Sequence, residues 1–415
     1  MNSRLRRILA CCFVLFLTAC TSTPHADRTA PSQRSVLLVS LDGFRAGDLD
    51  PDITPNLARI ARDGVRARWM TPVYPSLTFP NHYSIVTGLV PDHHGIVHNT
   101  MRDPELGGFK LSDRAAVGDG RWWGGEPIWV GAEKAGLRSA TLFWPGSEAE
   151  IAGVRPTRWR PFDDKMPLHA RVDTVVGWLS EPDATRPRIA TLYFETVDHA
   201  SHAHGPDSPQ ARDAIRAVDT AIGRLLDGLT ARGRLEDTDL IVVSDHGMVT
   251  VPPGNVIAVE DMATLEEAVV VTVGQVVTMI PKPGFEATVE RKLLGAHPQY
   301  DCWRKGELPA RRRYGTHPRI PPIVCQMHEG WDALPREAMA KRPPHDRGSH
   351  GYDPALPSMR ALFLARGPSF RRGVVIEPFV NVDVYPLLAR LIGIEAAATD
   401  GDIASLLPAL REGAP

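Results

Sequence analysis

The sequence predicts an α/β protein built on a central, mostly parallel β-sheet with helices on both faces. Three continuous apolar runs, at residues 35–41, 189–197 and 240–244, have the length and composition of strands that are buried on both sides. Between the second and third runs, apolar residues recur at intervals of three and four from 215 to 229, which indicates a long amphipathic helix. Such an alternation of strands and helices is typical of a sheet covered on both faces.

Shorter patterns predict further elements of the same kind. Residues 55–63 read as a helix that begins after an N-cap at Thr54 and ends at Gly64, with a proline in its first turn. Residues 361–365 form another apolar strand, and residues 384–394 form a late helix.

The pattern changes along the chain and indicates how it is organised. Residues 256–344 are rich in Pro and Arg and lack the regular alternation, so we expect an inserted lobe there. The expected order is a lipoprotein signal peptide at 1–19, a tether at 20–34, the first part of the α/β core at 35–255, the inserted lobe at 256–344, the closing part of the core at 345–395 and a C-terminal segment at 396–415.

Composition excludes several classes of protein. The 415 residues are 43% hydrophobic and 23% charged, which are ordinary globular values and rule out a disordered or multi-span membrane protein. The 47 basic and 49 acidic residues give a net charge of −2, and no block of Lys or Arg stands out. We therefore expect no nucleic-acid partner.

The N-terminus has the features of an export signal. Three arginines within residues 4–7 precede an apolar run at 8–19 that is too short to span a bilayer comfortably. The run ends in Leu-Thr-Ala followed by Cys20, which resembles a bacterial lipobox, and residue 21 is Thr rather than Asp. We expect a lipid on Cys20 that anchors the protein in the bacterial envelope, at the outer membrane facing the periplasm. The alternative is an ordinary secretory signal cut between Cys20 and Ala26.

Two cysteines remain beyond Cys20. In an oxidising compartment, Cys302 and Cys325 are expected to form one disulfide. Two free, buried thiols are the alternative.

Acidic and histidine side chains stand where each of the three predicted strands ends. Asp42 follows the first strand, Asp198 follows the second, and Asp245 and His246 follow the third. Ligands of open α/β sheets bind beyond the carboxyl ends of the strands. An Asp at one strand end is alternatively a helix cap or a turn former, but several such clusters together favour a ligand site.

Two further histidines complete this set. His202 lies four residues after Asp198, so one helical turn places both side chains on one face. His350 lies in GSHGYD, shortly before the strand at 361–365. Carboxylate oxygens and imidazole nitrogens together suit Zn²⁺, whereas a solvated polar loop is the alternative for the histidines near Asp198.

A hydroxyl stands at the start of another predicted helix. Thr78 precedes a run that ends near Gly88, and the N-terminus of a helix attracts anions through its dipole and its free N–H groups. A simple N-cap is the alternative. A bound metal nearby would stabilise the alkoxide, so we expect Thr78 to be a nucleophile.

Taken together, six separated segments resemble the nucleotide pyrophosphatase/phosphodiesterase family of the alkaline phosphatase superfamily, in the family's order over residues 35–395. They are SLDGFR, PSLTFPNHYSIVTG, HGIVHN, ETVDHASHAHGP, VVSDHGM and GSHGYD. The resemblance implies an alkaline-phosphatase-like fold. The segment at Thr78 lacks the C-x-P-x-R pattern of sulfatases, and no element matches the serine and arginine of the phosphomonoesterases.

The resemblance also implies a cofactor and a mechanism. It implies two zinc ions per chain, one held by Asp198, His202 and His350, and the other by Asp42, Asp245, His246 and the Thr78 oxygen. Thr78 would attack phosphorus to form a phosphothreonine-type intermediate that water then hydrolyses, and Asn99 would donate to a phosphate oxygen. The expected reaction cleaves nucleotide phosphodiester or pyrophosphate bonds to nucleoside 5′-monophosphates.

The substrate pocket is the least constrained part of this interpretation. In the family, the position of Phe79 stacks a nucleobase, and Phe162 stands where relatives carry Tyr; Leu111 would add an apolar wall. Both aromatics are alternatively core residues, and lipid-headgroup or other organic phosphodiesters stay open as substrates. A phosphomonoesterase or phosphonate hydrolase is the enzymatic alternative. A catalytically silent envelope binding protein is the other alternative, and it is disfavoured because every ligand and Thr78 are present.

Overall fold

A computed structural model describes residues 34–414. Within that range, eight strands form one sheet in the order β20-β2-β19-β9-β1-β8-β6-β7. Neighbouring strands are parallel except around β19, which runs antiparallel to both β9 and β2. The predicted mostly parallel sheet is therefore confirmed. Its strands are β1 (Ser35–Leu41), β2 (Val65–Ala67), β6 (Ser139–Leu142), β7 (Arg158–Trp159), β8 (Ile189–Phe194), β9 (Thr238–Val243), β19 (Phe363–Arg366) and β20 (Val374–Ile376).

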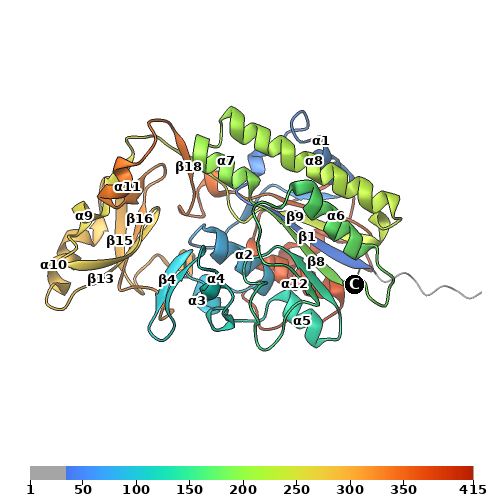
Figure 1. Ribbon diagram of the computed structural model, residues 1–415, viewed down its shortest axis with the longest axis horizontal. Coiled ribbons are helices and arrows are strands. Elements are labelled where there is room, and N and C mark those ends of the chain that lie inside the picture. Colours follow the sequence, from blue (N-terminus) through green and yellow to red (C-terminus); the bar gives the residue numbers. More distant parts are fainter. Residues whose placement is uncertain (1–33, 415) are drawn as a thin grey trace, which may run out of the picture. The chain divides into compact units, whose positions relative to one another are not determined.

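Helices cover both faces of this sheet, as predicted (Figure 1). All seven residues of β1 are buried, and its apolar residues alternate between two hydrophobic clusters. Leu37 and Val39 face the cluster of α1, α6 and α8, whereas Val36 and Leu38 face that of α2, α5 and α12. These helices are α1 (Pro55–Asp63), α6 (Leu168–Leu179), α8 (Pro209–Ala231), α2 (Thr78–Thr87), α5 (Ile128–Lys134) and α12 (Val384–Ile392).

One predicted strand is wrong in its extent, and one predicted helix cap forms without its side-chain hydrogen bond. The apolar run at 189–197 is not one strand, because β8 ends at Phe194 and α7 (Thr196–His204) begins two residues later. Val197 is buried in the first turn of that helix, so the apolar run continues across the boundary. Thr54 is the N-cap of α1, as predicted, but its side chain makes no capping hydrogen bond; its hydroxyl donates to the carbonyl of Asp50 at 2.8 Å instead.

The remaining predicted elements differ only at their ends. The predicted strand at 361–365 is displaced to β19, and the helix predicted to reach residue 394 stops at Ile392. Gly393 follows that helix with a φ of 77°, a left-handed conformation that glycine adopts without steric cost and that ends the helix.

A second sheet occupies the middle of the region expected to be an inserted lobe. It is antiparallel, in the order β12-β13-β16-β15-β14, and has a hydrophobic cluster of its own. Cys302 and Cys325 lie opposite each other on β15 and β16 and form the predicted disulfide. The lobe boundaries at 256 and 344 stay a prediction. The strands are β12 (Ala268–Thr272), β13 (Val276–Pro281), β14 (Gly295–Ala296), β15 (Tyr300–Arg304) and β16 (Ile323–Met327). The helix α10 (Glu286–Leu293) connects β13 to β14.

Short elements complete the described part of the chain. None of the helices within residues 34–414 combines the length and the apolar character needed to cross a bilayer. The predicted signal peptide and Cys20 lie outside the described residues. The short elements are β3 (Met70–Thr71), β4 (Thr100–Asp103), β5 (Gly107–Lys110), β10 (Val249–Val251), β11 (Val256–Ala258), β17 (Asp332–Leu334), β18 (Arg347–Ser349), β21 (Phe379–Val380), α3 (Pro91–His94), α4 (Arg114–Val117), α9 (Val259–Met262) and α11 (Arg336–Ala340).

Candidate active site

The sheet brings the predicted ligands to one edge. Strands β1, β8 and β9 are parallel neighbours, so Asp42, the helix α7 and Asp245 all follow them at the same edge. Because β19 runs the other way, the segment that precedes it reaches this edge as well. That segment carries His350, which explains how a residue before a strand meets residues that come after strands.

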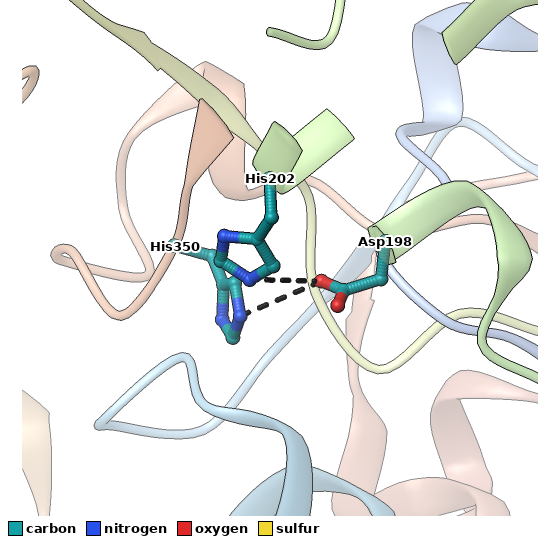
Figure 2. Close-up of side chains that lie close together, drawn as sticks. All are labelled: Asp198, His202 and His350. Atoms are coloured by element: carbon teal, nitrogen blue, oxygen red, sulfur yellow. Dashed lines mark ion pairs between the residues drawn. The ribbon is translucent and has the colours of Figure 1, made fainter. Parts of the chain in front are cut away.

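One set of candidate metal ligands consists of Asp198, His202 and His350 (Figure 2). The Nε2 atoms of His202 and His350 lie 3.3 and 3.5 Å from Oδ1 of Asp198. The Nδ1 atom of His202 lies 2.9 Å from the carbonyl of Gly348, and that of His350 lies 2.9 Å from the carbonyl of Ser76. A carbonyl only accepts, so each Nδ1 donates and each Nε2 is directed at the carboxylate, as in metal-binding histidines.

A second set adjoins the first. The Nε2 atom of His246 lies 2.9 Å from Oδ2 of Asp245 and 3.5 Å from Oδ1 of Asp42. Asp42, Asp198 and His246 also have ligand atoms within 4.8 Å of one another, so Asp198 belongs to both neighbourhoods. The structure therefore brings all six predicted Asp and His ligands together.

The site concentrates negative charge in a buried place. Asp42, Asp198 and Asp245 are 1%, 7% and 0% exposed. Burial, and then the charges of Asp245 and Asp198, raise the pKa of Asp42 well above its ordinary value. Burial alone would also raise the pKa of Asp245, but the neighbouring His246 and His82 hold it well below that value. Burial, and then His246, lower the pKa of His350 to about 3.

The donor atoms fit a metal ion. One oxygen of each of Asp42, Asp198 and Asp245 is buried without a hydrogen-bond partner. Each of these oxygens lies 2.9–3.5 Å from a histidine Nε2 atom without a hydrogen bond to it, and a bound cation would satisfy both atoms. Carboxylate and imidazole donors are the common ligands of Zn²⁺. The described residues around this edge therefore have the chemistry of a metal centre.

Thr78 is the first residue of α2, and its hydroxyl is directed at this centre. Its Oγ1 atom lies 3.3 Å from Nε2 of His246. The reading of Thr78 as a simple cap is wrong, because Leu77 is the N-cap and no side-chain hydrogen bond caps the helix. Asn99 lies beside it: its Oδ1 atom accepts the backbone N–H of Phe79 at 2.9 Å. That bond occupies the amide oxygen, so the group that Asn99 can offer a ligand is its Nδ2 donor.

A cavity of about 310 Å³ opens beside Thr78, within the size range of small-molecule sites. The predicted pocket residues Phe79, Leu111 and Phe162 line it together with Asn99. The Phe79 ring is partly buried and is backed by other aromatic rings, as is that of Phe162. The backing rings are Phe109 and Trp123, each 6.0 Å from Phe79, and Phe143 and Tyr193, 5.4 and 6.0 Å from Phe162.

Sequence reasoning missed two residues that contact the candidate ligands. His82 lies one turn after Thr78 on α2, and its Nδ1 atom is 3.2 Å from Oδ2 of Asp245. The hydroxyl of Tyr193 on β8 donates to Oδ2 of Asp42 at 2.6 Å. The spacing of four between Thr78 and His82 was a signal for the first of these, because it places both on one helix face.

The charged residues of the cavity wall were also missed. Glu148 and Glu195 line the cavity, and each is paired with an arginine, Arg114 and Arg171 respectively. Glu148 in addition accepts the backbone N–H of Phe162 at 2.9 Å. Glu148 stands close to none of the motifs. Glu195 is the first residue of the ETVDHASHAHGP segment, which was interpreted only for its Asp and His side chains.

Buried carboxylates, imidazoles and a helix-terminal hydroxyl meet at one edge of an α/β sheet. This arrangement defines the active site of a metal-dependent hydrolase. The chain belongs to the Type I phosphodiesterase / nucleotide pyrophosphatase family, whose sequence model matches residues 36–353. The family resemblance, the fold class and the enzyme class, a nucleotide pyrophosphatase/phosphodiesterase, are thereby confirmed.

Individual relatives agree with this assignment. The chain is 38% identical over 396 residues to ectonucleotide pyrophosphatase/phosphodiesterase family member 7 of Homo sapiens, which covers 92% of this chain and 84% of the relative. The solved structure of murine ectonucleotide pyrophosphatase/phosphodiesterase 5 matches with a TM-score of 0.86 at 34% identity, over 91% of this chain and all of that chain. An inactive Thr-to-Ala variant of that murine protein, solved in complex with AMP, matches equally well.

Proposed function

We propose that this enzyme binds two zinc ions per chain and cleaves nucleotide phosphodiester or pyrophosphate bonds through a covalent intermediate on Thr78. The observation that carries the proposal is the place of the Thr78 hydroxyl. It stands at a helix N-terminus, 3.3 Å from His246 and beside carboxylates that have unpartnered buried oxygens. Zinc bound there would supply charge stabilisation to the attacking and leaving oxygens.

The residues of the chain would then have distinct roles. Thr78 attacks phosphorus, so a bond forms between its Oγ1 and phosphorus while the bond to the leaving group breaks. Water next cleaves the phosphothreonine-type ester and restores the hydroxyl. The Nδ2 group of Asn99 and the backbone N–H of Thr78 donate to the phosphate oxygens.

The pocket supports a nucleoside as the group that is retained. Phe79 and Phe162 line the same cavity, and Leu111, which is 44% exposed, adds apolar surface at its wall. Stacking of a base on an aromatic ring contributes roughly 1–3 kcal/mol. The AMP bound to the murine relative is consistent with a nucleoside 5′-monophosphate as product.

The comparison of a diester with a monoester tests this proposal. A monoester carries nearly two negative charges and a third terminal oxygen, and the cavity lining offers Asn99 as the neutral donor near Thr78. We expect zinc-loaded enzyme to have a much higher kcat/KM for an aryl ester of a nucleoside 5′-monophosphate than for phenyl phosphate. Equal or faster turnover of phenyl phosphate would assign the enzyme to the phosphomonoesterases instead.

We further propose that the mature protein is lipid-anchored through Cys20 in the bacterial envelope, at the outer membrane and facing the periplasm. The support is the apolar run at 8–19 and the small residues that precede Cys20. A disulfide between Cys302 and Cys325 is consistent with such an oxidising compartment.

A further inference from the structure

The buried guanidinium of Arg171 contacts three parts of the active site at once. Arg171 belongs to α6, and its side chain is 1% exposed. Its Nη1 and Nη2 atoms donate to the two carboxylate oxygens of Glu195 at 2.5 and 2.8 Å. Such a bidentate pair is directional, and neither partner can be removed without leaving a buried charge alone.

The same guanidinium holds the segment that follows Phe162. Its Nε atom donates to the carbonyl of Met166 at 3.0 Å, and its Nη2 atom makes longer contacts of 3.4 and 3.5 Å to the carbonyls of Asp163 and Asp164. The guanidinium also lies 5.3 Å from the ring of Phe143, the ring against which Phe162 packs. Arg171 therefore holds one wall of the cavity in place by binding the backbone carbonyls of the segment that follows Phe162.

Glu195 and Tyr193 connect this wall to the candidate metal centre. The Nη1 atom of Arg171 donates to the carbonyl of Tyr193 at 3.0 Å, and the hydroxyl of Tyr193 donates to Asp42. Glu195 immediately precedes α7, the helix that carries Asp198 and His202, and its carbonyl accepts the N–H of His199 in the first turn. One buried ion pair thus joins the aromatic wall to the ligand helix.

We infer that Arg171 and Glu195 are a positioning pair for substrate selection, which holds Phe162 at a set place relative to the phosphate site. The inference rests on the proposed nucleoside pocket. Neither residue performs chemistry; they act through Phe162. Without the two parallel hydrogen bonds of the guanidinium, the segment at 163–166 can move. The enzyme then binds the nucleoside more weakly, while the phosphate site is retained.

The test uses Arg171→Lys, which keeps the charge and removes the bidentate fork. We expect KM for an aryl ester of a nucleoside 5′-monophosphate to rise at least fivefold with kcat nearly unchanged. For an aryl methyl phosphodiester, which has no base, kcat/KM should change less than twofold, and the zinc content should stay the same. If Arg171→Lys does not fold, the double variant Arg171→Met/Glu195→Gln, which removes both charges together, should lower the ratio of kcat/KM for the nucleoside ester to that for the methyl diester at least fivefold.

A matched control is an ion pair between the same helix and α8. Arg224 of α8 forms a bidentate pair with Asp173 of α6, with both distances at 2.7 Å, but both side chains are about half exposed and neither lines the cavity. Arg224→Lys should leave kcat/KM for both substrates unchanged. Because Arg171 acts through Phe162, Arg171→Lys should have no further effect on nucleotide selectivity in a Phe162→Ala background.

The outcomes separate this inference from the proposed function. If the wild-type enzyme does not prefer the nucleoside ester over the methyl diester, the nucleoside pocket itself is wrong. Two results overturn the positioning role when the wild type has that preference. One is an equal loss of kcat/KM on both substrates in Arg171→Lys. The other is that Arg171→Lys keeps its full effect on nucleotide selectivity in the Phe162→Ala background.

Discussion

Replacement of Phe79 by Ala is the perturbation that most directly measures the nucleoside pocket. The ring follows Thr78 on α2 and lines the cavity, and its backbone N–H is bound by Asn99. Two aromatic rings, those of Phe109 and Trp123, lie 6.0 Å behind it and hold it in place. A ring that is ordered before the substrate arrives loses little conformational entropy on stacking.

The expected magnitude follows from the stacking energy. A base on an aromatic ring contributes roughly 1–3 kcal/mol, and each ~1.4 kcal/mol is a factor of ten. Phe79→Ala should therefore lower kcat/KM for an aryl ester of a nucleoside 5′-monophosphate by about fivefold to a hundredfold. An aryl methyl phosphodiester has no base to stack, so its kcat/KM should fall by less than about threefold.

The assay compares the two substrates on zinc-loaded protein. Phe285→Ala is the control, because this phenylalanine is 40% exposed and is not part of the cavity lining. This variant should leave kcat/KM for both substrates unchanged. Equal losses on the two diesters in Phe79→Ala would refute the stacking argument and return Phe79 to the role of a core aromatic.

The remaining predictions concern the nucleophile, the disulfide and the anchor. Thr78→Ala should fold and keep most of its metal but lose turnover, since the covalent step then has no nucleophile; substantial activity in a metal-loaded variant would indicate direct attack by water. Joint replacement of Cys302 and Cys325 by Ala should lower the free energy of unfolding, measured with denaturant, by roughly 3 kcal/mol, because the loop spans 23 residues; an unchanged midpoint and slope would contradict this. Cys20→Ser should move the protein from the membrane fraction to the soluble periplasmic fraction, and persistent membrane association would argue against lipid on Cys20.

The positions of the candidate ligands were predictable because the sequence pattern shows where the buried strands end. A buried parallel strand is a continuous apolar run, and the first acidic residue after it, such as Asp42 or Asp245, marks the edge of the sheet. His350 was predictable only as part of a motif. Its approach to that edge depends on β19 being antiparallel, which no local pattern shows.

The residues that were missed owe their importance to neighbours distant in sequence. His82 reads as an ordinary helical histidine until the fold places Asp245 3.2 Å from it. Arg171 reads as one charge on an amphipathic helix, although its side chain is buried and turned toward Glu195. Thr54 takes the predicted N-cap position, but its hydroxyl donates to the carbonyl of Asp50 and so does not cap the helix.

Elemental analysis of gently purified enzyme tests the central claim most directly. Two adjoining ligand sets with unpartnered carboxylate oxygens predict about two zinc ions per chain, and loss of activity on chelation that zinc restores. His202→Ala, which removes a ligand from one set, should reduce the content to about one. One tightly held Mg²⁺ per chain with no zinc, or full activity after complete removal of metal, would contradict the two-zinc account.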